Sequence, residues 1–371
     1  MRYQLSLLIL IFLIKVLHAD RSCGSDYSNL WLDVVLVIDD SSNTTVEKLR
    51  LVVSNIIELF GQGTRIGTNY DDPRSTRLAI VPYSSTAFVF ADLDRFNSFQ
   101  EFSRSIESVF WDTLDTKQSN LSLGLIKAEE ALEAGRSNGT RNNYQQLIIV
   151  YTSSYQQNSW HVAQRLKEKN IHIAVVNMGS DDKEVEGKLR SIATDNMYFM
   201  YNTHLFDSLF HALMRTNCFC SNKRTNYTIS KRIQGTCLTL SDVKLSWESA
   251  KNACQRDFPN GFLASDMDVS EHSSIEDLLH KADAGGIEYY IGLFLGDTWH
   301  WEQPAGPPLG ILRGDNKDRW KSGYPVYPGT DTAVAVSFND IDGARWINID
   351  PKIEKYYICE SNACDTDNYC A

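Results

Sequence analysis

Three side chains with oxygen donors follow an apolar run near the start of the chain. Asp39, Ser41 and Asn43 alternate directly after the apolar residues 34–38. A short, continuous apolar run is typical of a strand that is covered on both faces. In open α/β sheets, ligands bind beyond the carboxyl ends of such strands. The pattern therefore predicts a loop that presents a carboxylate, a hydroxyl and an amide, and such oxygen donors suit a hard divalent cation such as Mg²⁺.

The elements that would position this loop are predicted by alternating patterns. Strand-like apolar runs alternate with amphipathic helical patterns as far as residue 216, and residues 46–60 carry one apolar stripe at helical spacing. Parallel strands need helical crossovers, so this order indicates an α/β domain with a doubly wound, mainly parallel sheet. We expect this first domain to span residues 23–217.

The same element order and the spacing at Asp39 resemble the von Willebrand factor A domain family. The resemblance implies a metal site built from three loops. In the first loop Asp39 and Ser41 match, and Asn43 stands where the family has serine. Ser119 is the hydroxyl at the second loop, and Ser153 replaces the aspartate of the third loop.

Loss of that aspartate weakens the implied site, because Mg²⁺ is usually retained by one or two carboxylates in near-octahedral geometry. Glycans on Asn43 or Asn120 would also cover the mouth of the crevice. We therefore expect no cofactor here and a domain that is kept as a scaffold. A working Mg²⁺ site formed by Asp39, Ser41, Asn43 and Ser119 is the alternative.

The first 19 residues predict a secretory signal peptide with cleavage after Ala19, and a signal anchor is the alternative. No other apolar run approaches the length of a membrane span, so we expect a secreted, extracellular mature chain without one. All eight cysteines follow Ala19, and an even number in a secreted chain indicates disulfide bonds. N-glycosylation is predicted at the sequons of Asn43, Asn120, Asn138 and Asn226.

The cysteine positions suggest a division of the chain. Pairing Cys23 with Cys218 would clamp both ends of the first domain, and Cys220–Cys237 would close a hairpin in a linker of residues 218–236. An exchange of Cys218 and Cys220 remains open. Cys364–Cys370 would close a loop in the polar tail of residues 363–371, and docking of this tail on the second domain is one possible arrangement.

A second set of motifs lies in residues 237–362. An amphipathic helix ends near Cys254, the strand 290–293 reads YIGL, and Trp299 and Trp301 form a W-x-W pair. Paired strands and the closing YICE follow. These motifs resemble the C-type lectin-like domain, over about residues 220–360. The resemblance implies an α+β fold and a Cys254–Cys359 disulfide, and the inner cysteine pair of that family is absent.

The calcium-dependent sugar site of the lectin family is not matched. Residues 324–326 read YPV in place of E-P-N or Q-P-D, and residues 346–348 read WIN in place of W-N-D. Asp331 and Asn348 remain as candidate oxygen ligands, but two such groups do not make a Ca²⁺ cage of 6 to 8 ligands.

The long loop of the second domain is rich in aromatic residues. Trp320, Tyr324 and Tyr327 are candidates to present aromatic faces to a sugar or a protein, as aromatic residues on loops do at interfaces. The alternative is that they pack the loop onto its own domain.

Two classes of function are disfavoured. A net charge of −11 argues against nucleic-acid binding. The chain has no H-E-x-x-H, no G-x-S-x-G and no Gly-rich phosphate loop, so we expect no catalysis. We expect a recognition or adhesion protein that binds extracellular proteins or glycans. A calcium-dependent lectin and a structural extracellular protein are the alternatives. The domain pairing resembles secreted nematode lectin-like proteins, which implies roles in innate immunity or cell adhesion.

Overall fold

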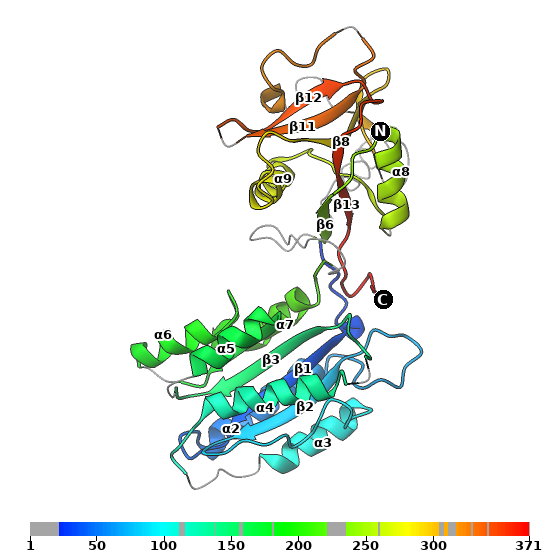
Figure 1. The fold of residues 1–371 in the computed structure, drawn as a ribbon. Coiled ribbons are helices and arrows are strands. Elements are labelled where there is room, and N and C mark those ends of the chain that lie inside the picture. The colour runs from blue at the N-terminus through cyan, green and yellow to red at the C-terminus, as the bar shows by residue number, and fades with distance from the viewer. Residues whose placement is uncertain are drawn as a thin grey trace, which may run out of the picture. The chain divides into compact units, whose positions relative to one another are not determined.

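The computed structural model describes residues 22–110, 116–137, 139–155, 159–179, 182–220, 235–258, 260–303, 308–310, 317–327, 329–339 and 341–370. One compact unit contains Gly24–Cys218 and Asp365–Ala371, and the other contains Phe219–Cys364 (Figure 1). The expected signal peptide and the sequons of Asn138 and Asn226 lie outside the described residues. Across the described ranges, no helix is long and apolar enough to cross a membrane.

The first unit is built on a five-stranded sheet in which every pair of neighbours is parallel. The order is β2-β1-β3-β4-β5. All eight residues of the central strand β1 are buried, because helices cover both faces of the sheet. The prediction of a doubly wound parallel sheet is confirmed. The strands are β1 (Leu32–Asp39), β2 (Arg77–Tyr83), β3 (Gln145–Thr152), β4 (Ile171–Asn177) and β5 (Tyr198–Met200).

Alternate residues of β1 belong to two separate cores. Val34, Leu36 and Ile38 pack with helices α2 (Val46–Phe60), α3 (Phe99–Val109) and α7 (Leu205–Thr216). Val35 and Val37 pack on the other face with α4 (Leu121–Ala134), α5 (Ser159–Glu168) and α6 (Lys183–Ile192). This alternation follows from the pleat of a strand, in which successive side chains point to opposite faces. A short 3-10 helix, η1 (Tyr27–Asn29), precedes β1.

Buried charges hold the amino end of the sheet. Asp33 is fully buried and accepts hydrogen bonds from Nε and Nη2 of Arg77, at 2.9 and 2.8 Å. Nε of Arg141 donates to the same carboxylate at 3.0 Å, and Nη1 of Arg77 donates to Asp94 at 2.7 Å. Buried charges are tolerated only when they are paired and hydrogen-bonded. The cluster therefore ties β1, β2 and the loop before β3 together.

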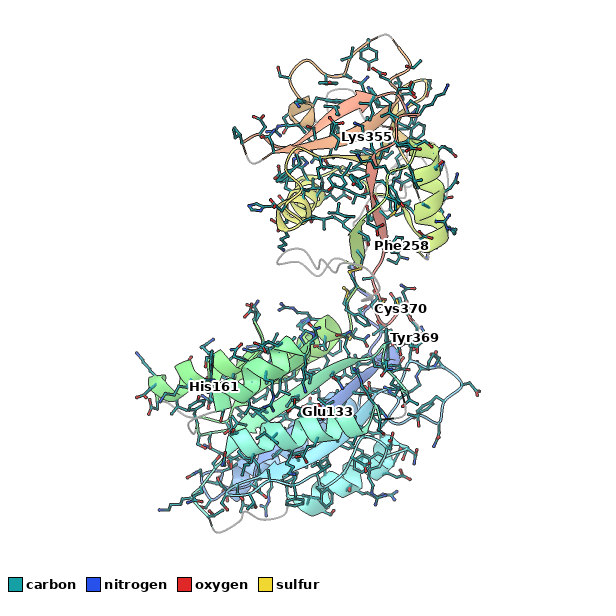
Figure 2. The ribbon with its side chains drawn as sticks, in the orientation of Figure 1. Glu133, His161, Phe258, Lys355, Tyr369 and Cys370 are labelled. Carbon is teal, nitrogen blue, oxygen red and sulfur yellow. A yellow bond between two sulfur atoms is a disulfide. The ribbon has the colours of Figure 1, made fainter. Side chains whose placement is uncertain are left out.

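The carboxyl-terminal segment completes the first unit. Trp31 is fully buried and packs edge-on against Tyr144 and Tyr369, with ring centroids 5.1 and 4.8 Å apart. Its Nε1 donates to the backbone carbonyl of Asp365 at 2.8 Å, and the Asp365 carboxylate accepts the N–H of Gly24 at 3.0 Å. Tyr369 and Cys370 are labelled in Figure 2. The tail that the sequence set apart as residues 363–371 is thus divided after Cys364.

The second unit combines two helices with a mainly antiparallel sheet, in which only the pair β8–β13 is parallel among the described strands. The order β10-β9-β8-β11-β12 forms one path, and β13 pairs with β6, β7 and β8. The helices are α8 (Trp247–Asp257) and α9 (Val269–Lys281), and a 3-10 turn, η2, spans Lys317–Arg319. The strands are β6 (Thr236–Leu240), β7 (Phe262–Leu263), β8 (Glu288–Leu295), β9 (Trp299–Trp301), β10 (Leu309–Gly310), β11 (Ala333–Asn339), β12 (Gly343–Ile349) and β13 (Tyr356–Asn362).

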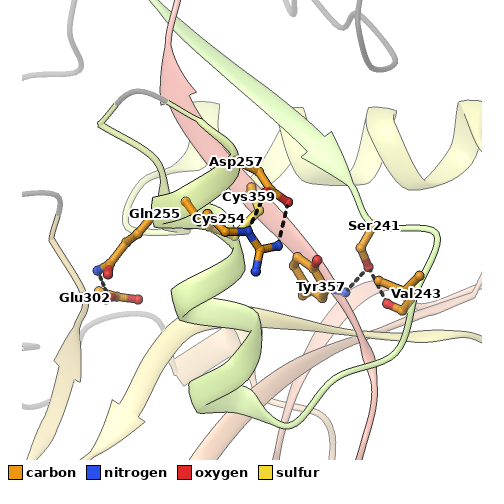
Figure 3. The surroundings of a disulfide bond; sticks show 9 residues. Ser241, Val243, Cys254, Gln255, Asp257, Glu302, Tyr357 and Cys359 are labelled. Atoms are coloured by element: carbon orange, nitrogen blue, oxygen red, sulfur yellow. Dashed lines mark hydrogen bonds and ion pairs between the residues drawn. A yellow bond between two sulfur atoms is a disulfide. The ribbon is translucent and has the colours of Figure 1, made fainter.

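Two of the four expected disulfides are present in the second unit. Cys254 of α8 is joined to Cys359 of β13 (Figure 3), and Cys220 is joined to Cys237. The bond to Cys237 therefore takes Cys220 and not Cys218. The other four cysteines are disulfide-bonded as well, and the pairings Cys23–Cys218 and Cys364–Cys370 stay predictions.

The buried cluster at Asp33 gives a test of what stabilises the first unit. In Asp33→Ala, the buried guanidinium of Arg141 loses its carboxylate, and Arg77 keeps Asp94 and the Gly135 carbonyl. This change should cost about 3–5 kcal/mol of unfolding free energy. Glu186→Ala removes the exposed pair with Arg190 on α6 and should cost less than about 0.5 kcal/mol. Urea unfolding of both variants, followed by circular dichroism, measures the difference. Equal midpoints would contradict a stabilising role of the cluster.

Candidate functional site

The carboxyl edge of the first sheet gathers hydroxyl groups around one buried carboxylate. Asp39, the last residue of β1, is 1% exposed. Its Oδ1 accepts the backbone N–H of Ser41 at 3.0 Å, and its Oδ2 accepts the hydroxyl of Ser119 at 2.7 Å. The structure thus brings together three of the residues that the sequence predicted for a site.

Asn43 hydrogen-bonds to a neighbouring loop and not to Asp39. Its side chain is exposed, and its Nδ2 donates to the backbone carbonyl of Lys117 at 2.7 Å. The backbone N–H of Ser42 donates to Thr116 at 2.8 Å in parallel. These bonds join the loop after β1 to the loop before α4, in which Asn120 caps the helix. The amide of Asn43 therefore links two loops and does not point a donor at Asp39.

The loop after β3 supplies two further hydroxyls that sequence reasoning missed. The hydroxyl oxygens of Thr152 and Ser154 lie 3.5 and 3.4 Å from Oδ2 of Asp39. Ser153, which was expected at the position of a ligand, instead donates to the backbone carbonyl of Asn43 at 3.3 Å. The signal was present in the sequence, because residues 152–154 are all hydroxyl residues, but sequence alone does not show which of them turn inward.

Burial sets the electrostatics of this edge. Burial raises the pKa of Asp39, although the hydrogen bonds from Ser41 and Ser119 oppose that effect. The neighbouring Asp40 has its pKa raised to about 6, first by burial and then by the negative charge of Asp39. Among the described residues, one oxygen of Asp40 is buried without a hydrogen-bond partner, and so is the hydroxyl of Tyr83.

These residues do not fit a Mg²⁺ ion that is held by protein side chains alone. The single carboxylate at the centre already accepts bonds from a backbone amide and from the hydroxyls around it. Within the described residues, no cluster of three His, Cys, Asp or Glu side chains with metal-ligand spacing includes Asp39. Mg²⁺ dehydrates reluctantly and needs nearly octahedral oxygen ligands. Hydrogen bonds from hydroxyls therefore satisfy the buried charge here.

In the second unit, Asn348 holds the long loop in place. It is 2% exposed, and its Oδ1 accepts the N–H of Val326 at 2.7 Å. Its Nδ2 donates to the backbone carbonyls of Val326 and Asp331, at 2.9 and 3.0 Å. The side-chain amide thus makes three hydrogen bonds to the loop backbone. An oxygen that accepts such a bond inside the protein is poorly placed to serve as a Ca²⁺ ligand.

A buried carboxylate also supports this loop at η2. Asp266 is fully buried and accepts hydrogen bonds from Nε1 of Trp346 at 2.7 Å and Nδ1 of His272 at 2.9 Å. The guanidinium of Arg319, in η2, bonds to the same carboxylate. Sequence reasoning missed Asp266, because an isolated aspartate in a loop carries no pattern.

The three aromatic candidates of the long loop have different environments. Trp320 is partly buried and packs on Trp299 and Trp346, with ring centroids 5.1 and 5.5 Å apart. Tyr324 is partly buried against the core that surrounds the Cys254–Cys359 bond. Tyr327 is 60% exposed, and its hydroxyl accepts the Nε1 proton of Trp299 at 2.9 Å. Of the three, only Tyr327 presents most of its side chain to solvent.

Asp40 gives a test of the electrostatics beside Asp39. A folded-state pKa of about 6 lies above the ordinary value of 3.8, so the folded state binds this proton more tightly. Folding therefore loses stability as the pH rises from about 4 through 6. The full shift corresponds to about 3 kcal/mol, and solvent screening at this partly exposed side chain reduces it to about 1 kcal/mol.

Asp40→Asn creates an N-x-S sequon at position 40, so both chains are produced in a host that attaches no N-glycans. The variant should be more stable than the parent chain by about 1 kcal/mol at pH 8, and should show no such gain at pH 4. Thermal unfolding at both pH values measures this. Asp71→Asn, at an exposed position of the same unit, is the matched control and should change neither value. A gain that is equal at pH 4 and pH 8 would show that the charge of Asp40 is not its cause.

Comparison with known proteins agrees with the two-unit organisation. Residues 33–215 match the family model of the von Willebrand factor type A domain. C-type lectin domain-containing protein 160 of Caenorhabditis elegans is 23% identical over 379 aligned residues. That alignment covers 95% of this chain and 56% of the relative, so the chain spans little more than half the length of the curated protein it matches.

Two solved structures are also similar to parts of the chain. Proximal thread matrix protein 1 of the mussel byssus, with a zinc-occupied MIDAS motif, is 21% identical, with a TM-score of 0.42. The match covers 50% of this chain and 46% of that one. Human lithostathine is 16% identical, with a TM-score of 0.31, and the match covers 38% of this chain and 90% of that one.

Proposed function

Because residues 33–215 form a von Willebrand factor type A domain, in a chain that is similar to a C-type lectin domain-containing protein, we propose that this is a secreted recognition or adhesion protein. It binds extracellular proteins or glycans and performs no catalysis. Domains of both families commonly present binding surfaces on loops that a rigid scaffold positions. The disulfides of the second unit are in keeping with an oxidising, extracellular environment.

Binding by the second unit is proposed to need no calcium. The observation that carries this proposal is the hydrogen bonding of Asn348, whose side-chain amide bonds to the backbone of the long loop. Tyr324 and Val326 offer no carboxylate or amide oxygen at the other ligand positions. The described residues around Val326 and Asp331 are therefore held by protein groups, and we propose that their order does not depend on an ion.

The proposed contact surface is the exposed tip of that loop. Val326 is 48% exposed and Tyr327 is 60% exposed. Asn348 accepts the backbone N–H of Val326, and Trp299 donates to the hydroxyl of Tyr327. A rigid aromatic side chain costs little conformational entropy when it is buried at an interface, and such residues often dominate binding energy. The first unit is proposed to act as the scaffold that accompanies this surface.

A ligand screen tests the proposal. The purified chain is applied to arrays of glycans and of extracellular proteins, once with Ca²⁺ and once with a chelator. We expect binding of equal strength in both conditions. Binding that disappears with the chelator would favour a calcium-dependent lectin, and absence of any ligand would favour a structural extracellular protein.

The loop tip is tested by substitution. Tyr327→Ala should weaken binding of a ligand from the screen about tenfold or more, as loss of an aromatic anchor does. Ile353→Ala, at a 48% exposed position outside the loop, is the control and should leave the affinity unchanged. Surface plasmon resonance measures both. An unchanged affinity of Tyr327→Ala would remove the loop tip from the binding surface.

A further inference from the structure

The outer edge of the first sheet carries an uncharged, exposed segment. After β2 the chain turns back and residues 86–91, TAFVFA, run antiparallel beside it through the bridges Tyr83–Ala87 and Ile80–Ala91. β2 itself is an end strand in the order of the sheet. Residues 86–91 therefore form the outermost strand-like segment on this side, which we call the edge segment.

The edge segment is only partly paired with β2. Backbone bonds join Ile80 to Phe90 and Ala91, and Ser84 to Thr86. Between these points, the backbone N–H groups of Ala87 and Val89 have no hydrogen-bond partner among the described residues. Pro82 adds to the gap, because it has no N–H to donate to a carbonyl of the edge segment. The pairing leaves backbone groups at this edge available to another chain.

The edge segment also exposes large apolar side chains to solvent. Phe88 and Phe90 are 51% and 42% exposed, and Val89 between them packs partly into the core. Two exposed phenylalanines at alternate positions project from the same side of an extended segment. Natural edges are normally protected by charged residues, proline or a covering element. Residues 86–91 include no charge and no proline.

We propose that this edge is an interface at which a second copy of the chain pairs, antiparallel, with the edge segment of the first. In a two-fold arrangement centred on Val89, each Phe88 lies opposite the partner's Phe90. Cross-strand aromatic pairs of this kind stabilise antiparallel strands. The same surface then serves both copies, as two-fold symmetry requires.

The charges next to the edge segment favour a second copy of this chain as the partner over a strand from another protein. With Val89 on the axis, the exposed Asp92 lies opposite the partner's Thr86, which is also exposed. The carboxylate of Asp92 thus meets a hydroxyl that can donate to it, and no two like charges face each other within residues 86–92. Asp94 stays paired with Arg77 of its own chain. The interface is small, so we expect a weak, reversible dimer.

Sedimentation of the intact chain over a range of concentrations tests the proposal. Asn120 donates to Ser84 beside one end of the segment, so the experiment is run with N-glycans and after their removal. We expect a concentration-dependent dimer, and Phe88→Lys with Phe90→Lys should raise its dissociation constant at least tenfold. The control is Ile341→Lys, at a position that is 94% exposed on the second unit, which should leave the dimer intact.

Two further measurements show whether the double lysine variant loses the dimer interface alone or is unfolded. Circular dichroism and the unfolding midpoint of the double lysine variant should match those of the parent chain. If they do not, Phe88→Thr with Phe90→Thr, which keeps strand propensity, takes its place with the same expected loss of dimer. Hydrogen exchange at residues 86–91 should slow as the protein concentration rises.

The proposal is overturned by a chain that stays monomeric at 200 µM in both preparations. It is equally overturned by a dimer that survives the substitutions in a folded variant, or by a dimer with no added exchange protection at residues 86–91. Binding of the same edge to a different protein, with no self-association, would assign the surface to another partner and also reject a second copy as its occupant.

Discussion

The Asp39 carboxylate is buried, and a buried charge must be satisfied where it lies. The amide of Ser41 and the hydroxyls of Ser119, Thr152 and Ser154 perform that task. These groups come from three loops that are far apart in the sequence. The need to satisfy one charge therefore determines how the loops after β1, before α4 and after β3 meet. The same carboxylate is the one at which the family resemblance implies a cation, and we propose that these hydrogen bonds take the place of that ion.

In the second unit, hydrogen bonds within the protein also satisfy a buried carboxylate. Asp266 is satisfied by Trp346, His272 and Arg319, and Asn348 is used to hold the backbone of the long loop. In both units, polar groups that could bind an outside ligand are bonded to the protein itself. We therefore propose that recognition depends on exposed side chains such as Tyr327, Phe88 and Phe90.

Much of the fold follows from local sequence patterns. The apolar run before Asp39 predicted a fully buried strand, and the helical stripe of residues 46–60 predicted α2, because both patterns depend on neighbouring residues. Contacts between distant residues were not accessible in this way. The bond between Trp31 and Asp365 joins residues 334 positions apart, and no local pattern reveals it. Likewise, Trp320 and Tyr327 look equivalent in sequence, and only the packing of Trp320 on Trp346 separates them.

The most direct test of this account is diffraction from crystals grown with Mn²⁺, recorded where manganese scatters anomalously. The account predicts no anomalous peak beside Asp39 or Asn348, with Ser119 still hydrogen-bonded to the Asp39 carboxylate. A strong peak bonded to Asp39, with the hydroxyl of Ser119 turned towards the ion, would contradict it and would restore metal-dependent recognition as the function of the first domain.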